Sequence, residues 1–325
     1  MLMARVASAL CAAHLGVVAS VSGVPIARAS ISHTLPSITY PTTNVIEDGD
    51  SFIAGLGVGT TYVYPQQGWA FRSVGTTANV AVSGYSTGDL IANFAAHVVP
   101  QISSSPGVVN VCAELAATND ANIYTPAQSI ANYGTLAGLA CAAGCTYTIF
   151  ATPVYKGGSY TQGNNNRDTL SPLMLALPAS LSTPRCQVLV VDPYDDPQMN
   201  VLGAVTAQAN ATLYQSDNVH PTVTGDTLLA GPFANALYSI GSRARIDTLS
   251  VSTGPVAGGT TVMIGGVGLV GVSHCYLAGV PVASATQVDS GHWSLVTGAG
   301  YYAGAYPTYC LTTLGSAKGP TFTLY

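Results

Sequence analysis

The sequence predicts a three-layer α/β domain built on a parallel sheet, followed by a small all-β domain. Through Ile240, short apolar runs rich in β-branched residues alternate with longer stretches that have a helical period. Runs this short and apolar suit strands that are buried on both faces of a parallel sheet. From Ile246 onward the helical period is lost, and Gly and Pro separate short Val, Ile and Thr runs. That texture is typical of an all-β sandwich.

The expected elements of the first domain follow from these runs. Its strands are predicted at Asn44–Glu47, Asn79–Val82, Val108–Ala113, Thr146–Ala151 and Gln187–Val191. Its helices are predicted at Ser86–Val99, Thr125–Ala142, Asp168–Ser180 and Thr224–Ile240. Because the two kinds of element alternate, the helices should cover both faces of the sheet. Sites in such sheets form at the carboxyl ends of the strands, so the residues that follow each strand are the candidates for chemistry.

The first 29 residues have the pattern of a removable secretion signal. Arg5 gives a basic start, an apolar run extends from Val6 to Val24, and Ala27-Arg28-Ala29 places small residues at the cleavage positions. A membrane anchor is the alternative, but His14 and the Ser and Gly content weaken it, and no stable membrane insertion is expected. A Pro/Thr/Ser-rich lead then covers residues 30–43. The expected location is extracellular, with the cell surface or the periplasm as variants of it.

Charge excludes some partners. Only 7% of the residues are charged, and loss of Arg5 and Arg28 would leave 7 basic against 14 acidic residues, a net charge of −7. The chain therefore has no basic patch to bind nucleic acid or anionic lipid.

Six cysteines remain once Cys11 leaves with the signal, and an even number in an exported chain favours disulfides. Cys275 and Cys310 lie alone in the C-terminal segment and are expected to pair. The other four allow three pairings, or one bridge and two thiols: Cys112, Cys141, Cys145 and Cys186. A zinc site is the competing interpretation, but no paired CxxC or nearby histidine supports it.

Four short blocks carry candidate chemistry. Three follow expected strands and the fourth precedes the last expected helix: Asp48-Gly49-Asp50-Ser51, Ser83-Gly84-Tyr85-Ser86, Thr118-Asn119-Asp120 and Asp217-Asn218-Val219-His220. Each alone is ordinary turn chemistry. Together they offer a serine, a histidine and a carboxylate where one pocket could form, which is the set used for acyl transfer. The remaining histidines have no motif partners and are expected to be structural or at the surface: His33, His97, His274 and His292.

In this order, the four blocks resemble those of the SGNH (GDSL-like) hydrolases, over residues 48–221. The resemblance implies a flavodoxin-like domain with a five-stranded parallel sheet over residues 44–243. It also implies a serine ester hydrolase, with Ser51 as nucleophile, His220 as base and Asp217 as its acidic partner, and no metal or organic cofactor. The oxyanion hole would comprise the N–H groups of Ser51 and Gly84 and the side-chain amide of Asn119. Ala117 stands where the family usually has glycine, which leaves the Asn119 donor in place.

Residues 244–325 resemble a second family, the IPT/TIG immunoglobulin-like domains. The resemblance rests on Gly254-Pro255, Gly258-Gly259-Thr260, the run Val262–Gly266 and the ending Phe322–Tyr325. It implies a spacer or binding module that holds the enzyme on a polysaccharide or cell-surface polymer and takes no part in the acyl step.

The expected function is therefore a secreted ester hydrolase acting on acyl esters of carbohydrates or small lipids. The same acyl-enzyme could instead pass its acyl group to a sugar hydroxyl, which would make the protein an O-acyltransferase. A non-catalytic surface adhesion or binding protein is the third interpretation, disfavoured because every catalytic position is intact.

Overall fold

The computed structural model describes residues 42–60, 63, 76–154, 161–193, 196–199, 211–239, 242 and 244–325. The expected secretion signal and nearly all of the lead segment lie outside these ranges. Within them, none of the helices is long and apolar enough to cross a membrane.

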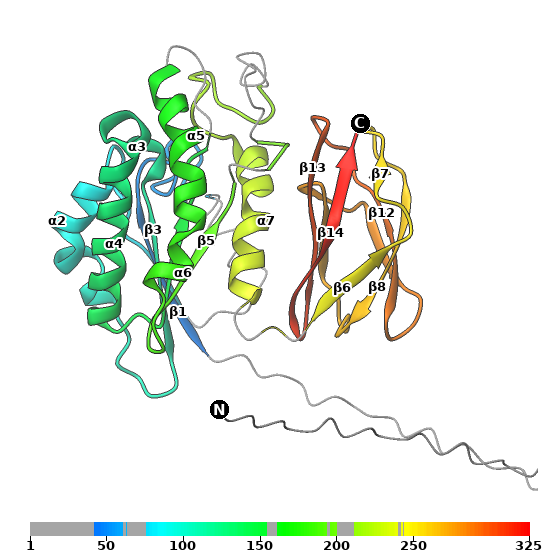
Figure 1. Ribbon diagram of the computed structural model, residues 1–325, viewed down its shortest axis with the longest axis horizontal. Coiled ribbons are helices and arrows are strands. Elements are labelled where there is room, and N and C mark those ends of the chain that lie inside the picture. Colours follow the sequence, from blue (N-terminus) through cyan, green and yellow to red (C-terminus); the bar gives the residue numbers. More distant parts are fainter. Residues whose placement is uncertain are drawn as a thin grey trace, which may run out of the picture. The chain divides into compact units, whose positions relative to one another are not determined.

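Five parallel strands form the central sheet of the first domain, in the order β2-β1-β3-β4-β5 (Figure 1). Their bounds are Thr43–Gly49 (β1), Thr76–Asn79 (β2), Val109–Leu115 (β3), Tyr147–Ala151 (β4) and Gln187–Val191 (β5). This order is that of the flavodoxin-like doubly wound fold, as expected, and it brings the carboxyl ends of β1 and β3 side by side.

Helices cover both faces of this sheet. They are Thr87–His97 (α2), Ala117–Ile123 (α3), Pro126–Ala143 (α4), Thr161–Leu175 (α5), Leu177–Leu181 (α6) and Val223–Ser239 (α7), with a 3₁₀ turn at Val99–Gln101. Successive strand residues point to opposite faces. Val45 therefore packs in the core under α7, whereas Ile46 packs in the core under α2, α4, α5 and α6. Figure 1 shows α7 on one side of the sheet and α2 and α4 on the other.

The sequence predicted most of these elements within two residues, with three exceptions. The second strand is Thr76–Asn79 and not Asn79–Val82, because a polar Thr-Thr run at the sheet edge pairs with β1, and the apolar residues follow it. The expected helix Asp168–Ser180 is two helices, of which α5 begins earlier and α6 restarts after Ala176 with a proline in its first turn. Asn119 and Asp120, expected in a turn, lie in the short helix α3.

Nine strands form one mixed sheet in the C-terminal region, which confirms its all-β character. The sheet has the order β10-β9-β13-β14-β6-β8-β12-β11, with β7 paired to β14. The strands are Arg245–Leu249 (β6), Thr253–Gly254 (β7), Thr261–Val267 (β8), His274–Leu277 (β9), Val280–Pro281 (β10), Ser284–Gln287 (β11), His292–Val296 (β12), Gly304–Thr312 (β13) and Gly315–Leu324 (β14). They enclose a core that includes Trp293 and Phe322. The specific IPT/TIG resemblance stays a prediction.

Three disulfides join the six cysteines of the described chain. Cys275–Cys310 links β9 to β13, as the sequence predicts. The four remaining cysteines, which the sequence left open, pair as Cys112–Cys145 and Cys141–Cys186. These two bridges tie α4 and its C-terminal turn to β3 and to the start of β5. Closing loops of 33 and 45 residues restricts the unfolded chain, which corresponds to about 4 kcal/mol per bridge in the chain-entropy model.

The C-terminal sheet packs on α7 through a buried aromatic cluster. Ala234 and Tyr238 of α7 contact Tyr276, Tyr306, Tyr309 and Leu311 of β9 and β13. On the same helix, a Cβ at Gly231 would lie 2.4 Å from the Tyr309 hydroxyl, so glycine permits this close approach. The sheet therefore shares buried surface with the helix that follows the candidate catalytic histidine.

Candidate active site

The candidate nucleophile lies in the turn directly after β1, residues 50–58, which we call the nucleophile turn. The N–H of Asp50 donates to the carbonyl of Leu115 at the end of β3, at 3.2 Å, and its carboxylate accepts from the N–H of Phe52 at 2.9 Å. Gly49 permits this contact, since a Cβ there would lie 2.5 Å from the Leu115 oxygen. The turn presses against the neighbouring strand and leaves Ser51 only 9% exposed.

Ser51, His220 and Asp217 form one hydrogen-bonded chain. The Nε2 atom of His220 lies 2.7 Å from the Oγ of Ser51, and its Nδ1 lies 2.6 Å from the Oδ2 of Asp217. Because Nδ1 faces a carboxylate, it carries the proton, which leaves Nε2 to accept the serine proton. The structure thus brings together three predicted residues from opposite ends of the α/β domain.

Asp217 is held as an anion by its neighbours. Its Oδ1 accepts the N–H groups of Val219 at 2.9 Å and of His220 at 3.0 Å. Partial burial raises the pKa of this carboxyl, but hydrogen bonds from the His220 ring and from these two N–H groups outweigh it, so the pKa lies below the usual value. The ionised carboxylate can therefore orient the imidazole and stabilise its charged form.

Local geometry aims the imidazole of His220. Asn218 has a φ of 58°, in the left-handed region that asparagine tolerates, which turns the chain between the aspartate and the histidine. The His220 ring packs against the ring of Phe52, with centroids 5.3 Å apart. The residue after the nucleophile therefore supports the base.

The segments of the two other predicted site residues are bound to each other. Asn119 donates its side-chain amide to the carbonyl of Tyr85 at 3.0 Å, directly after Gly84. Gly84 has a φ of 89°, a conformation that favours glycine. The N–H of Val82 donates to the carbonyl of Gly49 at 3.0 Å, which joins this segment to the nucleophile turn. The four blocks thus meet at the carboxyl ends of the strands.

Asp120 stabilises the same region through buried hydrogen bonds. Its two carboxylate oxygens, fully buried, accept the N–H of Thr87 at 2.8 Å and the hydroxyl of Thr87 at 2.6 Å. Burial raises the pKa of Asp120, although the hydrogen bonds from Thr87 oppose the shift. Helix α2 begins at Thr87, and Asp120 belongs to α3. These two bonds therefore hold the turn that contains Gly84, just before α2, against α3.

Sequence reasoning missed two buried acids behind the nucleophile. Asp48 and Glu114 are register partners on β1 and β3, and neither is exposed. Burial raises the pKa of Asp48 to about 6, although His97, whose Nδ1 lies 3.6 Å from Oδ2, and the Gly49 N–H oppose the shift. Burial and the charge of Asp48 raise the pKa of Glu114 well above its usual value. The available sequence signal was a carboxyl residue directly after each of two predicted strands, Asn44–Glu47 and Val108–Ala113.

Two of the histidines that were expected to be structural or at the surface lie next to acidic side chains. His97, besides approaching Asp48, stacks on the Tyr85 ring with centroids 5.9 Å apart and an interplanar angle of 3°. His292 bonds through Nδ1 to Asp289 at 2.9 Å, with the same spacing as the candidate pair, but both side chains are more than half exposed. The Asp-x-x-His pattern therefore occurs twice, and only one copy is bonded to a serine.

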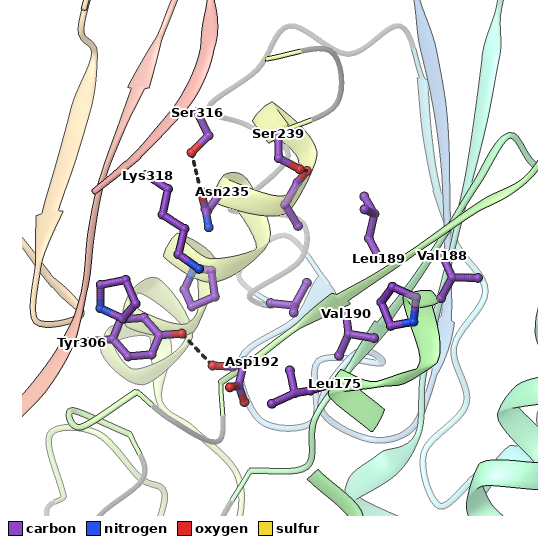
Figure 2. Close-up of a pocket in the computed structure, with 15 residues that line it drawn as sticks. Leu175, Val188, Leu189, Val190, Asp192, Asn235, Ser239, Tyr306, Ser316 and Lys318 are labelled. Atoms are coloured by element: carbon purple, nitrogen blue, oxygen red, sulfur yellow. Dashed lines mark hydrogen bonds between the residues drawn. The ribbon is translucent and has the colours of Figure 1, made fainter. Parts of the chain in front are cut away.

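Other features of the described residues stand apart from this constellation. A cavity of about 560 Å³ runs along the outer edge of β5 toward β13 and β14 (Figure 2). Its lining includes Val190, Asp192 and Lys318, and Tyr306 donates its hydroxyl to the carbonyl of Asp192 at 2.7 Å. None of the candidate catalytic residues lines it. Among the residues that the structure describes, no group of three or more His, Cys, Asp or Glu side chains is arranged to hold a metal ion.

Fold and site together define a doubly wound α/β protein with a Ser–His–Asp hydrogen-bonded chain at the carboxyl edge of its sheet. No family model and no curated protein matches the sequence. Among solved structures, a protein from Desulfitobacterium hafniense assigned to the G-D-S-L family of lipolytic proteins is 17% identical, with a TM-score of 0.47, over 60% of this chain and 99% of its own.

Two further solved structures are similar to the same degree. A member of the lipolytic G-D-S-L family from Veillonella parvula is 18% identical, with a TM-score of 0.46, over 59% of this chain and 96% of its own. An acetylxylan esterase from Geobacillus stearothermophilus is 19% identical, with a TM-score of 0.44, over 58% of this chain and 91% of its own. A fold does not carry an activity with it, so the chemistry is argued from the site residues of this chain.

Proposed function

We propose that this protein is a serine ester hydrolase that acts through an acyl-enzyme. The observation that carries the proposal is the chain of hydrogen bonds from Ser51 Oγ to His220 Nε2, at 2.7 Å, and from His220 Nδ1 to Asp217, at 2.6 Å. A hydroxyl is a weak nucleophile until an adjacent base can remove its proton. This arrangement supplies that base and the carboxylate that orients it.

In the first step, Ser51 Oγ attacks the carbonyl carbon of the ester while His220 Nε2 takes the hydroxyl proton. The new C–O bond moves the carbonyl electrons onto the oxygen. In the proposal, the N–H groups of Ser51 and Gly84 and the side-chain amide of Asn119 stabilise this oxyanion. Collapse of the tetrahedral intermediate then breaks the ester C–O bond, and the leaving alkoxide takes the proton from His220. The products are an alcohol and acyl-Ser51.

In the second step, water attacks the acyl group and gives its proton to His220. The intermediate collapses with the return of that proton to Ser51 Oγ, which releases a carboxylic acid and regenerates the enzyme. Asp217 stays ionised throughout and stabilises the imidazolium in both steps. Its lowered pKa supports this role.

The proposed substrates are acyl esters of carbohydrates or small lipids outside the cell. Three disulfides support an oxidising location, since such bridges form in exported proteins. The C-terminal all-β region, from about residue 244, is proposed to bind a polysaccharide or cell-surface polymer. The secretion signal over residues 1–29 belongs to the same proposal.

Hydrolysis of p-nitrophenyl acetate tests the proposal. The wild-type protein should turn over the ester, and a fluorophosphonate probe should modify Ser51, as located by peptide mass spectrometry. Ser51→Ala should remove both signals, while Ser290→Ala, at an exposed position between β11 and β12, should keep them. A wild-type protein that is folded, inactive toward a panel of esters and unlabelled at Ser51 would overturn the proposal.

A further inference from the structure

Gln215 lies at the neck of the loop that carries the candidate base. Its N–H donates to the carbonyl of His220 at 2.8 Å, and its carbonyl accepts the N–H of Asn218 at 2.9 Å. The preceding residue, Tyr214, forms an antiparallel bridge with Pro221. The backbone of Gln215 thus closes the loop around His220.

The side chain of Gln215 reaches out of this loop to the nucleophile turn. Its Nε2 donates to the carbonyl of Leu56 at 2.8 Å and to the carbonyl of Pro221 at 2.8 Å. Only the NH₂ end of an amide can donate to two carbonyl oxygens, so the acceptors determine its orientation. The N–H of Leu56 in turn donates to the carbonyl of Ser51 at 3.1 Å. One amide group therefore connects a residue bonded to the Ser51 backbone with the residue that follows His220.

Gly57 provides the space that this contact requires. A Cβ at this position would lie 2.2 Å from the Oε1 of Gln215 and 2.8 Å from its Cδ. Gly57 also has a φ of 82°, which disfavours any other residue. The nucleophile turn is thus shaped to receive the Gln215 amide.

We propose that Gln215 is a positioning residue that sets the separation between Ser51 Oγ and His220 Nε2. The inference rests on the proposed function. The two reacting side chains stand 169 positions apart on separate loops, and the Gln215 amide binds both loops directly. Proton transfer depends steeply on this separation, since a misplacement of about 1 Å can cost on the order of 100-fold in rate.

Two near-isosteric variants test this role. Gln215→Met removes both donors without adding charge, and Gln215→Glu replaces the amide by a carboxylate, which cannot donate when ionised. Both should lower kcat on a small ester by about 10- to 100-fold, with KM changed by less than about 3-fold and Tm by only a few degrees. Gln287→Met is the matched control, because Gln287 also donates its side-chain amide to a backbone carbonyl, that of Asp289, but in the C-terminal sheet. Wild-type kcat in folded Gln215→Met, or a loss of kcat in proportion to the unfolded fraction, would overturn the proposal.

Hydrogen exchange in the wild-type protein tests the contact without any variant. Both side-chain amide protons of Gln215 should exchange with solvent more slowly than those of Gln287, since both are hydrogen-bonded in the structure. Equal exchange rates for the two glutamines would overturn the proposed role of Gln215. A wild-type protein that shows the slow exchange but has no esterase activity and no labelling at Ser51 would instead overturn the proposed function.

Discussion

Asp48 and Glu114 face each other as register partners on β1 and β3, and each is the next-to-last residue of its strand. Both side chains are fully buried. Two carboxyl groups on adjacent residues of neighbouring strands repel each other if both ionise in a buried site of low dielectric. The imidazole of His97, the last residue of α2, lies against this pair, with its Nδ1 3.6 Å from the Oδ2 of Asp48.

This pair predicts that the protein loses stability as pH rises. Burial raises both folded-state pKa values, that of Asp48 to about 6 and that of Glu114 well above its usual value, so the stabilisation is complete below the unfolded values of 3.8 and 4.5. The part due to Asp48 should be lost between about pH 4 and its folded pKa of about 6, and the part due to Glu114 as pH rises through that group's own raised pKa. For Asp48 the effect is on the order of 3 kcal/mol. Urea unfolding at pH 4.5, 6 and 8 measures it. The double variant Asp48→Asn, Glu114→Gln should show a flatter dependence, and an unchanged slope would contradict the assignment.

Ser51 and His220 are predicted to act as one unit. Ser51→Ala and His220→Ala should each lower kcat by on the order of 10⁴- to 10⁶-fold, and the double variant should be little worse, since either loss disables the same step. His292→Ala is the matched control, because His292 makes the same bond to an aspartate three residues earlier. Steady-state kinetics would count against a shared mechanism if the losses in the double variant were strictly additive.

Asn119 is predicted to contribute to the rate rather than to substrate binding. Loss of one oxyanion donor typically lowers kcat by about 100- to 1000-fold, so Asn119→Ala should show a loss of that order with little change in KM. Asn93→Ala serves for comparison, because the exposed Asn93 amide bonds only within α2, to the carbonyl of Asp89. A variant in which KM rises and kcat is kept would assign Asn119 to ground-state binding.

The C-terminal sheet is predicted to stabilise the α/β domain without entering the chemistry. A chain that ends at Ser242 would expose the face of α7 that holds Ala234 and Tyr238, now covered by Tyr276 and Tyr309. We expect a clearly lower Tm by circular dichroism, with kcat per folded molecule on a small ester retained. Unchanged Tm would mean that the aromatic cluster contributes little, and a folded but inactive protein would place part of the site in the sheet.

Much of the architecture could be predicted because local sequence encodes burial. The strand Gln187–Val191 was predicted with its observed bounds, since four consecutive apolar residues after Gln187, three of them valine, leave few alternatives between turn residues. The strand Thr76–Asn79 was misplaced, because a polar edge strand has no apolar pattern of its own and exists only through its pairing with β1. Helix α3 was missed for the related reason that Asn-Asp is typical of turns.

The sequence by itself determined the candidate nucleophile, acid and base, because each belongs to a short motif whose spacing is a local property: the aspartate and histidine are three residues apart, within one loop. Tertiary structure alone decided how the four cysteines of the α/β domain pair, that Asp48 opposes Glu114, and that Gln215 joins two loops whose residues are 159 positions apart. Those contacts depend on strand register and on how closely separate loops approach. Neither leaves a trace in the local pattern, because the packing of the whole domain sets both.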